Sequence, residues 1–152
     1  MEAFTQSGLI KGMMTANTKP PIRLMIVDDN EHIRRIIKSI VSDLVEELYE
    51  CEDGRQALAL YAEHRPDWVL MDIRMKEMDG LDATSHIVAA FPDARIVIVT
   101  DHDDSELRDA ARRAGACRYL NKRNLLDIRL LLSTGSTDPD SPPKGSWLSG
   151  HT

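Results

Sequence analysis

The chain has few cysteines, few aromatic residues and no long apolar run. It contains two cysteines in 152 residues, and aromatic residues make up 5%. Cys51 and Cys117 match neither a metal-binding spacing nor a Cys-x-x-Cys motif, so we expect two small buried side chains. No run approaches the roughly 20 apolar residues that span a bilayer, and Lys11 has no apolar segment beside it that would make a signal peptide. These absences predict a cytoplasmic protein that does not insert into membranes.

The charge balance argues against a general nucleic-acid binder. The chain carries 19 basic and 25 acidic residues, a formal net charge of −6. Affinity for phosphate backbones depends on Lys and Arg, so we expect no direct contact with nucleic acid. Hydrophobic residues at 42% and charged residues at 29% are typical of a globular domain with one core.

The composition places one domain between two flanking segments. Residues 1–21 show no sustained periodicity and end in Pro20-Pro21, which indicates a flexible lead-in. Residues 133–152 are rich in Ser, Thr, Gly, Pro and Asp, which predicts a disordered tail whose only hydrophobic spot is Trp147-Leu148. The domain is therefore expected at 22–132. Little foldable sequence follows it, so we expect a stand-alone module without an output domain.

Strand and helix patterns alternate through this domain. Strands are expected at 22–27, 45–51, 68–71, 95–99 and 117–120, where apolar and β-branched residues cluster. Helices are expected at 33–44, 55–64, 81–91, 107–114 and 124–132, the fourth with a capping box of Asp103 and Glu106. Strict alternation predicts an α/β fold, a doubly wound parallel sheet with helices on both faces.

Polar residues follow four of the expected strands. Asp28 and Asp29 follow the first, Asp72 the third, Thr100 the fourth and Lys122 the fifth. The carboxyl ends of parallel strands share one edge of a sheet, where open α/β folds place their chemistry. We therefore expect three carboxylates, a hydroxyl and an amine to converge.

These residue types suit phosphoryl transfer. Clustered carboxylates attract a divalent cation, and all-oxygen ligands favour Mg²⁺. A carboxylate can also attack phosphorus and form an aspartyl phosphate. The Lys122 amine and the Thr100 hydroxyl can then stabilise the phosphoryl oxygens.

The motifs resemble the receiver domain of two-component response regulators. The spacing agrees, with 72 − 29 = 43, 100 − 72 = 28 and 122 − 100 = 22 positions. The resemblance covers about 22–132 and implies a flavodoxin-like (βα)5 fold with strand order 2-1-3-4-5. That order puts Cys51 and Cys117 near opposite edges, too far apart to bridge. The matching segments are Asp28-Asp29, 71–75, 78–80, Thr100, Gly115-Ala116 and 119–122.

The resemblance also implies roles for individual residues. Asp72 would accept a phosphoryl group from a histidine kinase or a phosphotransfer protein. Mg²⁺ would be held by Asp28, Asp29, Asp72 and the backbone carbonyl of Arg74. The module would catalyse only its own phosphorylation and slow dephosphorylation.

A conformational switch is implied as well. Lys122 would pair with the phosphoryl group, Thr100 would close on it, and Tyr119 would swing inward. This population shift would reshape the face formed by helix 107–114, strand 117–120 and helix 124–132, where an effector protein would bind.

The chain departs from the family pattern at several loop positions. Asp101 and His102 follow Thr100, where the family usually has a small residue; we expect Asp101 to face solvent. Arg123 replaces a common proline after Lys122, so we expect a trans peptide bond there. Arg74, Asp101 and His102 are candidates for tuning the phosphoryl lifetime, although exposed loop positions would explain Arg74 and His102 equally well.

Two other functions stay open at this point. An aspartate-nucleophile phosphatase of the haloacid-dehalogenase type needs a second acid two positions after the nucleophile, and this chain has Arg74 there. A pseudo-receiver would bind partners without phosphorylation; the complete acidic set argues against it, but Asp101 keeps it open. Helix 124–132 carries more apolar residues than one stripe can bury, so a homodimer or an effector contact through it is a further hypothesis.

Overall fold

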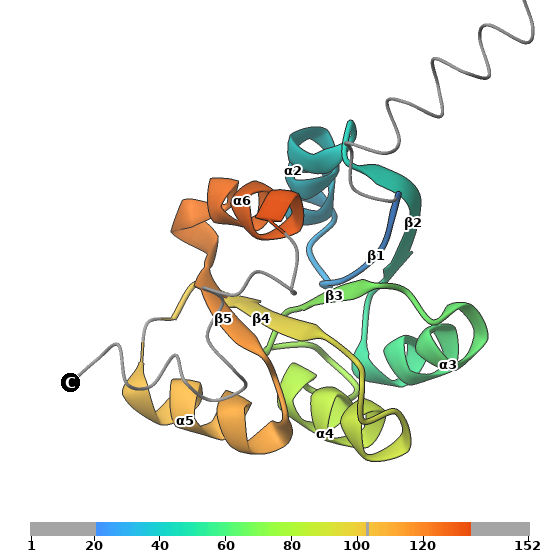
Figure 1. The fold of residues 1–152 in the computed structure, drawn as a ribbon. Helices are drawn as coiled ribbons and strands as arrows, with labels where there is room; N and C mark the ends of the chain where they lie inside the picture. Colours follow the sequence, from blue (N-terminus) through green and yellow to red (C-terminus); the bar gives the residue numbers. More distant parts are fainter. Residues whose placement is uncertain (1–20, 103, 135–152) are drawn as a thin grey trace, which may run out of the picture.

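A computed structural model describes residues 21–102 and 104–134 (Figure 1). The strands are β1 (Ile22–Val27), β2 (Val45–Cys51), β3 (Trp68–Met71), β4 (Ile96–Thr100) and β5 (Arg118–Asn121). The α-helices are α2 (Glu31–Val41), α3 (Gly54–His64), α4 (Gly80–Ala90), α5 (Ser105–Ala114) and α6 (Leu126–Thr134), and a 3₁₀ turn, η1 (Lys122–Asn124), precedes α6. The predicted alternation of strands and helices is confirmed.

The strands form one parallel sheet of order β2-β1-β3-β4-β5, as predicted. β1 and β3 are neighbouring inner strands of this sheet and are almost wholly apolar. All four residues of β3 and the last four of β1 are buried. Strands buried on both faces are expected wherever helices cover both sides of a sheet.

Two helical layers cover the sheet (Figure 1). Along β1, Leu24 and Ile26 pack in the cluster beneath α2 and α6, whereas Met25 and Val27 pack in the cluster beneath α3, α4 and α5. Each fully buried side chain of this kind contributes about 1.5–3 kcal/mol. The alternation along β1 therefore assigns α2 and α6 to one face and the other three helices to the opposite face.

Local capping fixes where the helices begin. Asn30 accepts hydrogen bonds from the backbone N–H groups of His32 and Ile33, so α2 starts directly after the first acidic pair. The N-cap of α5 is Asp104, which accepts from the Glu106 backbone N–H. The predicted capping box with Asp103 is therefore wrong by one position, and Asp103 itself lies outside the described residues.

The end of the domain differs from the prediction in detail. Asn121 accepts a hydrogen bond from the Arg123 backbone N–H and starts the turn η1, so α6 begins at Leu126 and not at position 124. No peptide bond of the described part is cis, which confirms the expectation at Arg123. α6 continues to Thr134, two residues beyond the predicted domain end. The flanking segments 1–20 and 135–152, with the predictions made for them, lie outside the described residues.

The two cysteines lie at or next to opposite edges of the sheet. Cys51 is buried in β2, Cys117 is half-buried next to β5, and neither takes part in a disulfide. None of the helices in the described ranges has the length and apolar character that a bilayer crossing requires.

Candidate functional site

The expected site lies at the carboxyl ends of the central strands. Two backbone hydrogen bonds hold the acidic residues in place there. The Asp28 N–H donates to the Cys51 carbonyl at 3.1 Å, and the Asp72 N–H donates to the Val27 carbonyl at 2.9 Å. The sheet ladder thus continues into both acidic positions and places their side chains together.

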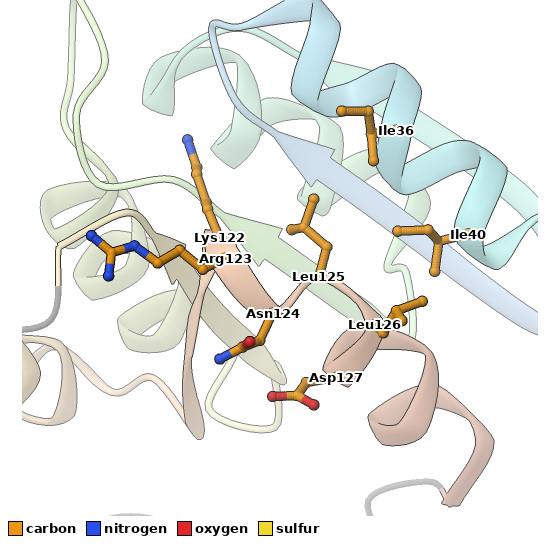
Figure 2. Close-up of a pocket in the computed structure, with 8 residues that line it drawn as sticks. All are labelled: Ile36, Ile40, Lys122, Arg123, Asn124, Leu125, Leu126 and Asp127. Atoms are coloured by element: carbon orange, nitrogen blue, oxygen red, sulfur yellow. The ribbon is translucent and has the colours of Figure 1, made fainter.

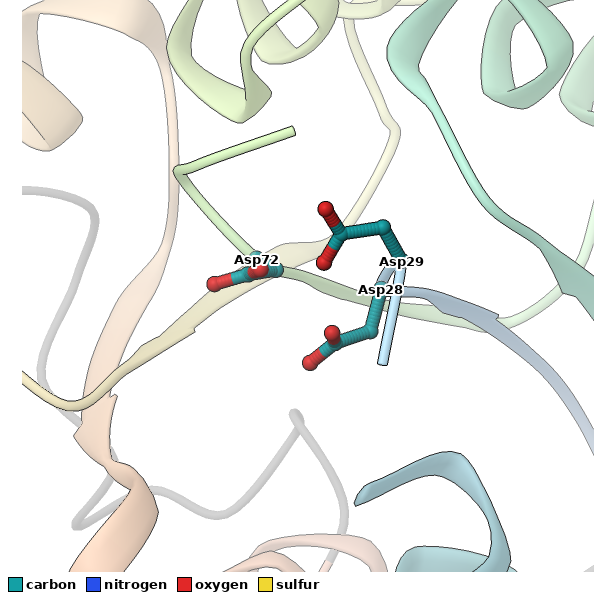
Figure 3. A group of neighbouring side chains, drawn as sticks. All are labelled: Asp28, Asp29 and Asp72. Atoms are coloured by element: carbon teal, nitrogen blue, oxygen red, sulfur yellow. The ribbon is translucent and has the colours of Figure 1, made fainter. Parts of the chain in front are cut away.

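Three carboxylates converge at this edge (Figure 3). One oxygen each of Asp28, Asp29 and Asp72 lies within 4.8 Å of the others. Asp28 and Asp72 are 3% and 7% exposed, whereas Asp29 is exposed. Two sheltered carboxylates and one open to water suit Mg²⁺, which prefers oxygen ligands and keeps part of its hydration shell.

Lys122 brings an amine to the same place. Its Nζ lies 2.9 Å from Asp28 Oδ2 and 3.2 Å from Asp72 Oδ1. Burial alone would lower the pKa of Lys122, but the hydrogen bond that its amine donates to Asp28 and the charge of Asp72 outweigh it and raise the pKa. The amine is therefore a fixed cation between the two buried acids.

Asp72 has the most strongly perturbed carboxyl group of the site. Burial, reinforced by the charge of Asp28, raises the pKa of Asp72 to about 6, against the opposing effect of Lys122. A bound cation would offset this penalty because it stabilises the ionised form. The site therefore combines an ionisable, buried carboxylate with an amine donor beside it.

Arg34 supports the site and was not predicted from the sequence. Its Nη1 donates to the Asp28 carbonyl at 2.5 Å, and its Nε pairs with Glu50 at 3.0 Å. Lys38 also reaches Glu50, at 2.9 Å. Only its position in the sequence pointed to this role: Arg34 lies one helical turn after the N-cap Asn30, on the polar side of an amphipathic helix.

Gly80 is a second residue whose role the sequence did not reveal. In the sequence it belonged only to the matching segment 78–80. An added Cβ would lie 1.8 Å from the Asp72 carbonyl oxygen, so only glycine fits there. The Gly80 N–H also donates to the Ile73 carbonyl at 2.8 Å. The start of α4 is thus packed directly against the backbone of Asp72.

Thr100 and Tyr119 are linked through the loop that follows β4. Thr100 is 2% exposed, and its Oγ1 accepts a 3.3 Å hydrogen bond from the His102 N–H. The Tyr119 hydroxyl donates to the His102 carbonyl at 2.6 Å. The two predicted switch residues therefore contact the same loop residue.

The remaining candidates lie at the rim. Asp101 is exposed, as expected, and its carboxylate lies 2.6 Å from Nδ1 of His102. The hydrogen bond from His102 lowers the pKa of Asp101. Arg74 is exposed in the loop after β3, so its side chain does not belong to the buried part of the site.

Comparison with known proteins agrees with this architecture. Residues 24–132 match the family model of the response regulator receiver domain. The chemotaxis protein CheY of Halobacterium salinarum is 36% identical over 100 residues, which are 66% of this chain and 83% of that protein. The response regulator MprA of Mycobacterium sp. (strain KMS) is 34% identical over 129 residues, which are 80% of this chain and 56% of that protein.

A solved structure shows the same fold. A two-component response regulator of the LuxR family from Aurantimonas sp. SI85-9A1 superposes with a TM-score of 0.68 at 31% identity, over 74% of this chain and 86% of that one. The chain therefore belongs to the response regulator receiver domain family of two-component signalling. It spans about half the length of the transcriptional regulatory proteins among its curated relatives.

Proposed function

We propose that Asp72 accepts a phosphoryl group from a histidine kinase or a phosphotransfer protein. One observation carries the proposal: the Lys122 amine bridges Asp28 and Asp72 inside a cluster of three carboxylates. An Asp72 oxygen attacks phosphorus, the new O–P bond forms as the N–P bond of the donor phosphohistidine breaks, and the imidazole leaves. Position 74 holds an arginine where turnover of phosphate esters would need an acid, which supports a signal carrier over a phosphatase.

Asp28, Asp29, Asp72 and the Arg74 backbone carbonyl would hold Mg²⁺. When bound, this ion neutralises charge on the transferring group. Asp28 also holds Lys122 in place through their 2.9 Å contact. The lysine amine then supplies a second positive charge for the phosphoryl oxygens.

Signalling would follow from the loop that joins Thr100 to Tyr119. When the Thr100 hydroxyl closes on the phosphoryl group, it moves the backbone of His102, because the His102 N–H is hydrogen-bonded to it. Tyr119 follows, since its hydroxyl is hydrogen-bonded to the His102 carbonyl. The surface formed by α5, β5 and α6 would then favour one of two states and bind an effector protein or a second copy of the chain. The domain would act in the cytoplasm and would not contact nucleic acid directly.

Arg74, His102 and Asp101 would tune the phosphoryl lifetime. The Asp101 carboxylate is held against His102, so the pair can orient or shield attacking water at the rim. The test is the decay rate of the phosphorylated protein after Arg74→Ala and His102→Ala. Half-lives equal to that of the native chain would remove this role.

Beryllofluoride, which mimics a phosphoryl group, tests the proposed site without a kinase. With Mg²⁺, we expect amide NMR shifts at Thr100, His102 and Tyr119 in the native chain and none in Asp72→Asn. A native chain that does not respond would support a pseudo-receiver that binds partners without phosphorylation. Turnover of phosphate esters would instead support the phosphatase.

A further inference from the structure

A groove of about 440 Å³ lies between α2 and α6 (Figure 2). Its apolar lining comes from Ile36 and Ile40 on α2, from Leu125 just before α6 and from Leu126 at its start. Lys122 and Arg123 lie at one end of it. The proposed phosphoryl chemistry does not use the apolar part.

A clamp formed by Arg129 joins α6 to the C-terminal end of α2 beside the groove. Arg129 of α6 donates to the Ile40 carbonyl at 3.0 Å and makes two hydrogen bonds to Asp43, at 2.6 and 2.8 Å. Beneath this clamp, Ile128 and Leu132 are fully buried. The helix pair therefore presents a preformed surface.

Exposed leucines extend the apolar surface along α6. Leu126 is 68% exposed and Leu130 is 64% exposed. Residues four apart lie on the same face of a helix, so the two side chains form one stripe that continues from the groove.

A hydrophobic pair follows this surface in the sequence. Residues 135–152 follow α6 directly, and Trp147 and Leu148 are their only large hydrophobic residues. We propose that Trp147-Leu148 folds back and docks on the α2–α6 groove and the Leu126–Leu130 stripe of the same molecule. The proposal does not depend on phosphorylation.

The connecting segment is long enough for this. From Thr134 back to Leu126 the helix spans eight residues, or about 12 Å at 1.5 Å per residue. The twelve residues 135–146 separate Thr134 from Trp147. A coil of that length has a root-mean-square span of about 20 Å, so the Trp147 side chain can reach both leucines without stretching the chain.

The size of the surface favours a tethered segment over a second copy. A stable interface between proteins buries about 800 Å² on each partner, far more than two leucines and a shallow groove provide. A single tryptophan buries about 150–250 Å², which suits this surface. Tethering also gives the segment a millimolar effective concentration, so a weak contact is sufficient.

Quenching of tryptophan fluorescence by iodide tests the proposal on the full chain. Trp68 is 3% exposed in the core, so iodide should quench its fluorescence very little. The Trp147→Phe variant keeps only Trp68 and measures this background. We expect Trp147 to be protected in the native chain. The double change Leu126→Asp and Leu130→Asp should raise the quenching constant of Trp147 at least two-fold.

A matched control separates docking from the added charge. Ala59 and Ala62 are exposed on α3, and Ala59→Asp with Ala62→Asp should leave the quenching unchanged. Equal quenching of Trp147 in the native chain and in the leucine variant would overturn the proposal. Protection that grows with protein concentration, together with a doubled mass in sedimentation, would overturn it in favour of a second copy.

Discussion

The Tyr119 hydroxyl donates a 2.6 Å hydrogen bond to the backbone carbonyl of His102. The His102 N–H in turn donates to Oγ1 of Thr100 at 3.3 Å. One residue of the loop after β4 thus contacts both the hydroxyl expected to sense the phosphoryl group and the aromatic ring next to α5. This connection gives the proposed switch a physical path.

Tyr119→Phe should weaken the switch without abolishing chemistry. A net hydrogen bond is worth about 0.5–1.5 kcal/mol, so its loss should weaken the coupling between Thr100 and Tyr119 roughly two- to ten-fold. Beryllofluoride with Mg²⁺ should still bind, but the NMR shifts along β5 and α5 should shrink. Tyr61→Phe, on α3, serves as the control and should respond as the native chain does; a full response from Tyr119→Phe would contradict the proposed path.

Lys122→Met should separate cation binding from phosphoryl binding. Removing the amine leaves Asp28 and Asp72 with more negative charge, so Mg²⁺ should bind more tightly by about 1 kcal/mol, roughly five-fold. Beryllofluoride should bind at least ten-fold more weakly because its fluorines lose a cationic partner. Calorimetric titration measures both, with exposed Lys76→Met as the charge-matched control. Weaker Mg²⁺ binding in Lys122→Met would show that the amine organises the carboxylates and does not compete with the ion.

Ionisation of Asp72 should destabilise the metal-free protein. Its pKa is raised in the fold to about 6 from 3.8, so the folded state favours the protonated form. The stabilisation by that proton is complete below the unfolded pKa and is lost as the pH rises through about 6. Asp72→Asn should therefore raise the free energy of unfolding near neutral pH by roughly 1–3 kcal/mol.

Urea unfolding in a chelator measures this effect. The advantage of Asp72→Asn should shrink as the pH falls from about 7.5 to about 5, and added Mg²⁺ should reduce it at neutral pH by stabilising the native carboxylate. An advantage that stays constant with pH would mean that the burial of Asp72 does not penalise its charge.

Gly80→Ala should displace the backbone of Asp72, the proposed phosphoryl acceptor. The new Cβ would lie 1.8 Å from the Asp72 carbonyl oxygen, so the backbone at the site or the start of α4 has to move. We expect a loss of roughly 3 kcal/mol or more in stability and a lower affinity for beryllofluoride. Ser85→Ala, exposed on the same helix, should stay within about 0.5 kcal/mol of the native chain. Native stability and affinity in Gly80→Ala would refute the close packing.

The sequence predicted the sheet because its central strands are continuous apolar runs that end in polar residues. Asp28, Asp72 and Lys122 could be placed together because parallel strands end at one edge. The roles of Arg34 and Gly80 could not be predicted, because each depends on a backbone carbonyl that only the fold brings near. Arg34 donates to the carbonyl of Asp28, and Gly80 packs against the carbonyl of Asp72. The start of α6 was misjudged because the Asn121 cap creates a 3₁₀ turn first, a competition that hydrophobic periodicity does not detect.

Incubation with acetyl phosphate and Mg²⁺, followed by intact mass spectrometry, tests the central claim most directly. The native chain should gain the mass of one phosphoryl group, in a form that is labile to hydroxylamine as acyl phosphates are. Asp72→Asn and a sample treated with chelator should gain none. A native chain that stays unmodified, or an Asp72→Asn variant modified to the same extent, would contradict the assignment of Asp72 as the acceptor.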